Sequence, residues 1–288
     1  MNKKMKILSF GEIIWDVYPD RKTLGGAPLN FALHSAACGA DAYMISAVGS
    51  DPLGDEAVAE TEKRGVNTRF ILRSDRETGR CNVTLDENKV PSYDLMRDTA
   101  YDFISLSDAD LDAIKAESFD AVCFGTLIQR GANSRASLRR LMEKVSFGTV
   151  FCDVNLRKGN YDESSVRFCL ENATALKVSL EEAPDLGELR IYPSPSDSSP
   201  ESLADILLST FSNLRSIVLT DGAHGAYSVE RGGRLIFCPA RKVKVVSTVG
   251  AGDSFGAAWL TSRFAGDVPE ISLGKAVDYS ADVISGKR

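Results

Sequence analysis

Short apolar runs alternate along this chain with longer segments of helical periodicity. The runs are short enough for strands buried on both faces, and they cover residues 5–10, 42–48, 121–124, 149–154, 176–178 and 216–219. Amphipathic segments lie between most of them, at residues 52–64, 108–115, 134–145 and 202–211. This alternation predicts an α/β fold: a doubly wound, mostly parallel sheet flanked by helices.

Two regions depart from the alternation. Residues 13–18 and 69–95, the second with period-two alternation at 81–85, predict antiparallel strands. We expect them to form a small sheet that projects from the core, with its strands at approximately 12–24 and 69–97. No internal repeat is evident in the 288 residues, so we expect a single domain over 1–288.

Composition and charge exclude several classes of partner. The net charge of −6 argues against a nucleic-acid surface, which needs a basic patch. No apolar run approaches the roughly 18 residues of a membrane span. The basic start is followed by an apolar run that Gly11 and Glu12 interrupt, so no signal peptide is expected. The six cysteines are scattered without C-x-x-C spacing, which is typical of buried thiols in a reducing compartment and predicts a cytoplasmic protein.

The stretch 247–260 carries the strongest chemical signal. The β-rich segment 242–246 leads into a glycine turn that opens a small-residue helix. The backbone N–H groups of Gly250, Ala251 and Gly252 then point forward with the helix dipole behind them, which predicts an anion site. Asp253 in the first helical turn makes sense there if the anion is a phosphoryl group and the acid orients an attacking hydroxyl.

Other interpretations of this stretch are available. Asp253 could merely complement the helix dipole, and the glycines could merely form a tight turn. The glycines at 250, 252 and 256 miss the G-x-G-x-x-G spacing of a dinucleotide site by one residue, and the chain contains no P-loop motif.

A second glycine-led helix begins near residue 25. Pro28 suits its first turn, and Asn30 lies close to the glycine mouth. Alone, Asn30 could be a solvated polar residue. Together with Asp16 on the projecting strands it would form a clamp for vicinal hydroxyls, because a carboxylate accepts two hydroxyl protons while an amide both donates and accepts.

These motifs, in this order, resemble those of the ribokinase-type carbohydrate kinases, and within them the fructokinases. The match covers nearly the whole chain: Gly11-Glu12 with Asp16, then 25–30 (GGAPLN), 48–54 (VGSDPLG), 153–157 (DVNLR), 220–225 (TDGAHG) and 250–253 (GAGD). Members that act on ribose usually carry Gly-Gly-Lys-Gly where this chain has Gly-Gly-Ala-Pro, which favours a fructose-like hexose. The resemblance implies a ribokinase-like fold with the projecting sheet as a lid.

The resemblance also implies roles for individual residues. Asp253 would be the base for the sugar's primary hydroxyl, with the amides of Gly250, Ala251 and Gly252 as the anion hole and Arg157 neutralising γ-phosphate charge. The sugar would be held by Asp16, Gly26, Asn30, Asp153 and Asn155. The nucleotide would be held by Thr220, Gly222 and Gly225. ATP and Mg2+ are implied, together with a monovalent cation, and the lid allows homodimerisation.

Three departures from the family pattern lie on the nucleotide side. Ser247 stands where relatives often have Asp, and Ser179 where they have Asn, which leaves Glu182 as the acid that acts on magnesium from the second coordination shell. The chain also ends at Arg288, so part of the wall around adenine is expected to be missing.

The primary hypothesis is an ATP-dependent kinase of fructose or a close hexose. A kinase of a nucleoside or a keto-deoxy sugar acid is the alternative within enzymes, and the lid arginines 69, 73, 76, 80 and 97 leave the sugar acid open. A catalytically weak sugar-binding regulatory protein is the alternative outside them. At a helix N-terminus Asp253 is expected to be well ionised.

Overall fold

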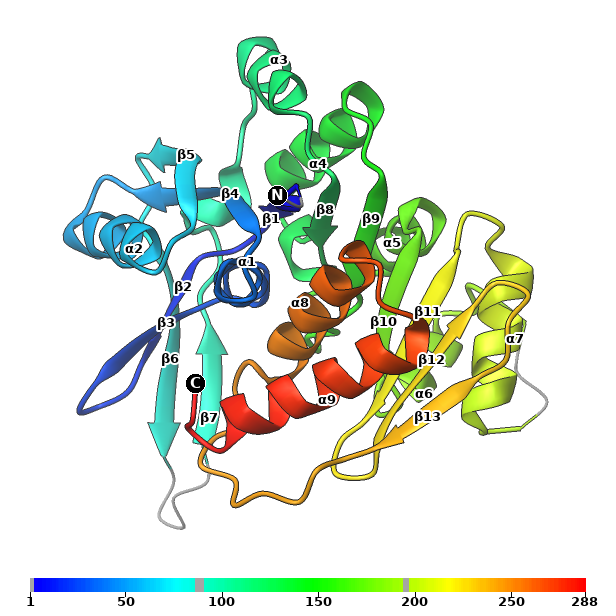
Figure 1. Ribbon diagram of the computed structural model, residues 1–288. Helices are drawn as coiled ribbons and strands as arrows, with labels where there is room; N and C mark the ends of the chain where they lie inside the picture. Colours follow the sequence, from blue (N-terminus) through cyan, green and yellow to red (C-terminus); the bar gives the residue numbers. More distant parts are fainter. Residues whose placement is uncertain (1–2, 86–90, 194–196) are drawn as a thin grey trace.

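A large mixed sheet forms the centre of the molecule (Figure 1). The computed structural model describes residues 3–85, 91–193 and 197–288. In spatial order the nine strands are β13 (Ile236–Pro239), β12 (Gly225–Glu230), β11 (Ser216–Asp221), β10 (Ala175–Ser179), β9 (Thr149–Asp153), β8 (Ala121–Phe124), β1 (Lys6–Phe10), β4 (Asp41–Gly49) and β5 (Asn67–Ser74). All neighbours from β11 to β5 are parallel, while β12 and β13 are added antiparallel at one edge. The predicted α/β fold with a mostly parallel sheet is confirmed.

Helices cover both faces of this sheet because successive strand residues point to opposite sides. One face packs against α3 (Asp108–Glu117), α4 (Ala132–Lys144), α5 (Glu163–Asn172) and α7 (Pro200–Thr210). The other face packs against α1 (Ala27–Ala37), α8 (Ala251–Phe264) and α9 (Pro269–Ile284). On β9, for example, Phe151 belongs to the α8 side, and Cys152 belongs to the α5 side. The strands are therefore apolar on both faces, as their short continuous runs predicted.

A separate four-stranded sheet projects from this core (Figure 1). Its order is β3 (Lys22–Gly25), β2 (Ile14–Val17), β6 (Gly79–Leu85) and β7 (Pro91–Leu95). We call it the lid. Its pairs β2–β3 and β6–β7 are antiparallel, whereas β2 and β6 are parallel. The expectation of a wholly antiparallel lid is therefore corrected.

The lid prediction also began too early in its second segment. β5 (Asn67–Ser74) pairs with β4 at the edge of the large sheet and does not join the lid. An edge strand has one partner and exposes alternate side chains, so in sequence it resembles a strand of a small two-sided sheet. The segment 242–246 also differs from its prediction: it forms no strand, and four of its five residues are exposed.

The remaining elements are short or lie at the periphery. They are α2 (Pro52–Lys63), α6 (Ala183–Glu188) and the 3-10 turns η1 (Ala100–Phe103) and η2 (Leu127–Gln129). Within the described ranges, no helix has the length and apolar character that crossing a bilayer requires.

The strand order reverses between β1 and β8. From β1 the chain proceeds to β4 and β5 on one side, and it then returns to β8 on the other side. In open α/β sheets such a reversal leaves a crevice beyond the carboxyl ends of the strands, where ligands bind. The site should therefore lie where β1, β8 and β9 end.

Candidate active site

A small cavity lies at this reversal. Its lining comes from the segment between β1 and β2, the start of α1, the ends of β8 and β9 with the residues after them, and the start of α8: Glu12, Ala27, Pro28, Phe31, Cys123, Phe124, Gly125, Thr126, Leu127, Asp153, Asn155 and Asp253. Segments as distant in sequence as residues 12 and 253 thus meet at one point. Three of the residues proposed from sequence, Asp153, Asn155 and Asp253, line this cavity together.

Asp253 is positioned by the start of α8. Gly250 caps this helix with φ 76°, a left-handed conformation that favours glycine, so the chain turns sharply into α8. Within this turn the Ala251 N–H donates to the Thr248 carbonyl at 3.2 Å. The Asp253 carboxylate accepts a hydrogen bond from the Asn30 side chain, with 2.9 Å between Asn30 Nδ2 and Asp253 Oδ2. The first turns of α1 and α8 are therefore joined at the carboxylate itself.

Asn30 and Asp16, the two members of the expected sugar clamp, lie on different parts of the molecule. The Asn30 amide contacts Asp253, whereas Asp16 lies on β2 opposite Thr23 and beside Gly25 of β3. Asp16 is half-buried, and burial raises the pKa of its carboxyl while the charge of Arg157 lowers it. Asp16 belongs to the lid and Asn30 to the core, so a sugar held by both would touch the two parts at once.

Gly26 and Glu12 shape the turn between the lid and α1. Gly26 has φ 112°, and a Cβ placed there would lie 2.4 Å from the backbone oxygen of Glu12. Glu12 is 3% exposed, and its Oε1 accepts the Ala27 N–H at 3.1 Å. The position therefore requires glycine, and the Glu12 side chain satisfies an amide at the start of α1 that no helical carbonyl can reach.

Asp153 forms a buried ion pair with Lys177. The Lys177 ammonium lies 2.9 and 2.8 Å from the two carboxylate oxygens, and the side chains are only 6% and 11% exposed. Burial alone would lower the pKa of Lys177, but the Asp153 carboxylate outweighs it and the pKa lies above its ordinary value. Lys177 also runs beneath the anion-site turn, since a Cβ at Gly252 would meet its Nζ at 3.0 Å.

Burial sets the protonation of the central carboxyls. It raises the pKa of Asp253 to about 7, and the nearby Asp153 charge adds to the effect, while Asn30, Lys177 and Arg157 act in the opposite direction. Burial likewise raises the pKa of Glu12 to about 7. The expectation of a well-ionised Asp253 is therefore corrected: loss of water outweighs the helix dipole, and the carboxyl titrates near neutral pH.

The loop after β9 brings a cation to these acids. Asn155 has φ 42°, and the preceding Val154 is held by the Thr126 hydroxyl, which donates to its carbonyl at 2.8 Å. Arg157 is exposed, and its charge lowers the pKa of Asp253, Asp16 and Glu12 alike. The Arg157 guanidinium would neutralise part of the negative charge of an anionic ligand bound near these carboxyls.

Glu182 is committed to the backbone. Its two carboxylate oxygens accept the N–H groups of Leu156 at 2.6 Å and of Ser179 at 2.8 Å. Burial and the Asp153 charge raise the pKa of Glu182. Across the parts of the chain that the structure describes, no group of three or more His, Cys, Asp or Glu side chains is placed to hold a metal ion.

The predicted nucleotide residues lie in the β11–β12 hairpin. Thr220 is the penultimate residue of β11 and lies beside Ser179 of β10. The turn passes through Gly222 with φ 49° to Gly225 with φ 143°. A Cβ at Gly225 would lie 2.2 Å from the backbone oxygen of Cys238 on β13. The positive φ angles and the close backbone approach explain why glycine stands at these positions. The turn lies at the same edge of the sheet as Asp153 because β9, β10 and β11 are parallel.

The whole chain matches one family. The model of the pfkB family carbohydrate kinases matches residues 5–287. The chain belongs to this family. It is therefore a sugar kinase, a phosphotransferase with an alcohol group as acceptor, and its sheet with an attached lid is the ribokinase-like fold.

Relatives span nearly its full length. The fructokinase of Klebsiella pneumoniae is 28% identical over 288 residues, which are 97% of this chain and 91% of the relative. An uncharacterised sugar kinase of Pyrococcus horikoshii is 28% identical over 283 residues, or 95% of this chain and 84% of the relative. The structure of that kinase in complex with ATP aligns with a TM-score of 0.77 over 96% of this chain and 91% of its own. A ribokinase II of Escherichia coli in complex with ATP and Mg2+ shares the fold, with a TM-score of 0.82, 20% identity and coverage of 98% and 93%.

Two residues of this pfkB site escaped sequence reasoning. Lys177 was hidden in the apolar run ALKVS, although a lysine within a strand buried on both faces needs a carboxylate partner, and that was the available signal. Glu12 was noted only as part of a motif, and nothing local showed that it reaches Ala27.

We expect activity to depend on the titration of Asp253. A base must be deprotonated to act, so kcat/KM for the sugar should fall about tenfold per pH unit once the pH lies below about 7. The measurement is a pH profile of kcat/KM between pH 5.5 and 8.5. A profile that stays flat down to pH 5.5 would contradict the assignment of this carboxyl as the base.

Proposed function

We propose that this kinase transfers the γ-phosphoryl group of ATP to the primary hydroxyl of fructose, giving fructose 6-phosphate. The observation that carries the proposal is the meeting of Asp253, the glycine turn at 250–252 and Asn30 at the reversal between β1 and β8. The Gly26-Ala27-Pro28 sequence after the lid, and the fructokinase relative, support a hexose of this kind.

Each residue has one task in the proposed reaction. Asp16 of the lid and Asn30 of α1 hold the sugar hydroxyls, with Gly26, Asp153 and Asn155 beside them. Asp253 accepts the proton of the primary hydroxyl as its oxygen attacks the γ-phosphorus in line with the departing ADP. The amides of Gly250, Ala251 and Gly252 stabilise the charge on the transferring group, and Arg157 neutralises it from the other side. In a loose transition state the hydroxyl proton leaves late, so orientation contributes most.

The nucleotide and its metal occupy the opposite half of the proposed site. Thr220, Gly222 and Gly225 line the nucleotide. Magnesium would enter with ATP and would be held mainly by phosphate oxygens and water, because Glu182 already accepts two backbone N–H groups and Asp153 is paired with Lys177. When bound, the ion supplies charge neutralisation at the β- and γ-phosphates. Dependence on a monovalent cation, a cytoplasmic location, a single domain over 1–288 and a homodimer through the lid remain parts of the proposal.

A kinase of a sugar acid is disfavoured by the positions and the partners of the five arginines expected to serve it. Arg69 and Arg73 lie on β5 of the large sheet, and only Arg80 lies on a strand of the lid. A substrate carboxylate needs free cations, yet each of these residues already has a partner: Arg69 with Glu117, Arg73 with Asp55, Arg76 over Phe103, Arg80 with Glu77 and Arg97 with the Gly159 carbonyl. Fructose is neutral and therefore needs no such cation.

An ADP-release assay over a panel of sugars, a sugar phosphate, a keto-deoxy sugar acid and adenosine tests the proposal. We expect turnover with fructose and none with fructose 6-phosphate or adenosine. Faster turnover of adenosine or of the sugar acid than of fructose would identify that compound as the substrate in place of fructose. A sugar-dependent thermal shift without turnover would indicate a binding protein.

A further inference from the structure

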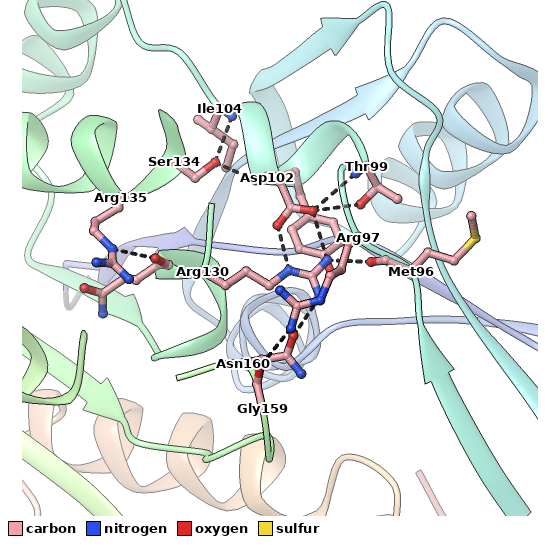
Figure 2. Close-up of polar contacts among 12 residues, drawn as sticks. Met96, Arg97, Thr99, Asp102, Ile104, Arg130, Ser134, Arg135, Gly159 and Asn160 are labelled. Atoms are coloured by element: carbon pink, nitrogen blue, oxygen red, sulfur yellow. Dashed lines mark hydrogen bonds and ion pairs between the residues drawn. The ribbon is translucent and has the colours of Figure 1, made fainter. Parts of the chain in front are cut away.

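Arg130, at the end of η2, occupies a buried position between the lid and the active-site loop (Figure 2). Its guanidinium pairs with Asp102 through two bonds, Nε to Oδ1 at 2.7 Å and Nη2 to Oδ2 at 2.9 Å. The side chains are 4% and 5% exposed. A bidentate arginine pair removed from water in this way holds one orientation.

The surroundings of the pair restrict it further. Asp102 also accepts the Thr99 N–H, which closes the capping box of η1. The guanidinium lies over the Tyr101 ring, 4.9 Å from its centroid. A Cβ at Gly131 would lie 2.4 Å from the Asp102 carbonyl oxygen, so the two backbones touch. Arg130 therefore has a fixed place relative to the core.

The remaining guanidinium hydrogens reach two other segments. Nη2 donates to the Met96 carbonyl at 2.5 Å, directly after lid strand β7, and Nη1 donates to Asn160 Oδ1 at 3.1 Å. A second arginine repeats the connection from the lid side, because Arg97 donates to the Gly159 carbonyl at 2.7 Å. Figure 2 shows Arg97 and Arg130 both directed towards Gly159 and Asn160.

Asn160 in turn defines the shape of the loop that carries Arg157. The Asn160 N–H donates to the Arg157 carbonyl at 2.8 Å, and its side chain donates to the Lys158 carbonyl at 3.2 Å. The loop between Val154 and Asn160 is thus closed on itself at its far end. Movement of Asn160 would displace Arg157.

We propose that Arg130, through its buried pair with Asp102, is a positioning residue that fixes the Arg157 loop to the end of lid strand β7. This inference rests on the proposed function, in which Arg157 faces the transferring phosphate. The Arg130 guanidinium thus holds both the end of lid strand β7 and the loop that carries Arg157. In the proposed function the lid covers the sugar and Arg157 faces the phosphate, so these contacts align the two halves of the site. We call the contacts of Arg130 with Met96 and Asn160 the joint.

Asn160 variants test the joint without disturbing the buried pair. Asn160→Ala removes the acceptor of Arg130 Nη1, whereas Asn160→Asp keeps an oxygen there. Arg140→Met is a matched control, since Arg140 connects α4 to Leu106 and Asp108 and contacts neither the lid nor the loop. In hydrogen exchange of the ligand-free protein, the peptide covering 154–161 should exchange about tenfold faster in Asn160→Ala alone, the loss expected for a bond to a charged donor. Equal exchange in Asn160→Ala and wild type would overturn the proposal.

A double-mutant cycle tests whether Asn160 acts through Arg157. With the sugar that the wild type prefers, Asn160→Ala should lower kcat about tenfold, Asn160→Asp should retain most of it, and Asn160→Ala added to Arg157→Met should cost nothing more. Additive losses would overturn the positioning role. Absence of turnover with every sugar in the wild type would instead refute the proposed function, and the exchange experiment would still decide the joint.

Discussion

Replacing Asp253 with asparagine should lower kcat by at least about 100-fold while sugar affinity is largely kept. Asparagine has nearly the same shape and retains an oxygen for the Asn30 amide, which now lies 2.9 Å from the carboxylate. It cannot accept the hydroxyl proton, so only orientation and the anion site remain. The measurement is steady-state kinetics with fructose and ATP, together with calorimetric titration of the sugar. Near-normal turnover would remove Asp253 from the mechanism.

The stability of Asp253→Asn provides its control. Because burial raises the Asp253 pKa to about 7 from an ordinary value of 3.8, the folded state holds this proton more tightly than the unfolded chain. Ionisation therefore costs stability progressively as the pH rises from about 4 to 7, and the cost stays at its maximum above 7. The neutral variant should unfold at the same or a higher urea concentration than the wild type at pH 8, and the advantage should vanish near pH 4. A less stable variant at pH 8 would indicate damage to the fold.

Replacing Lys177 with methionine should lower the free energy of unfolding by about 3–5 kcal/mol, the usual cost of leaving one buried charge unpaired. The Asp153 side chain is 11% exposed, and both of its carboxylate oxygens accept hydrogen bonds from this ammonium. Urea unfolding of the variant and the wild type at pH 8 measures this loss.

The matched control for Lys177→Met removes both charges. The double variant Lys177→Met with Asp153→Leu should be less destabilised than Lys177→Met alone, since no buried charge remains unpaired. The single variant should also raise the pH below which kcat/KM declines, because Lys177 lowers the pKa of Asp253. A single variant as stable as the wild type at pH 8 would show that water reaches Asp153.

The roles of Lys177 and Asp253 also explain why the anion-site turn has its sequence. Gly250 is needed for a left-handed turn, and Gly252 leaves room for the lysine beneath it. The turn is therefore the cover of a buried ion pair as well as the proposed anion site. Neither the helix dipole nor the need for a tight turn explains by itself why both Gly250 and Gly252 are present.

The helical and strand segments were largely predictable because their signals are local. Parallel strands covered on both faces must be apolar throughout, so runs such as 121–124 were found. The signal failed at β5, where one uncovered edge gives the alternation of a small sheet, and at 242–246, whose β-branched residues form no strand. Secondary-structure propensity there was outweighed by the absence of a partner strand.

By itself the sequence determined the α/β class, the two glycine-led helices and the chemical candidates at their starts, because turns, caps and periodicity depend on neighbours along the chain. Only the tertiary structure decided the partners: Asn30 with Asp253 across 223 residues, Asp153 with Lys177, and Arg130 with Asp102. It also placed Asp253 where burial raises its pKa to about 7. Ionisation and ion pairing depend on which side chains the fold brings together and on how much water it removes, and neither quantity is encoded in any local run of residues.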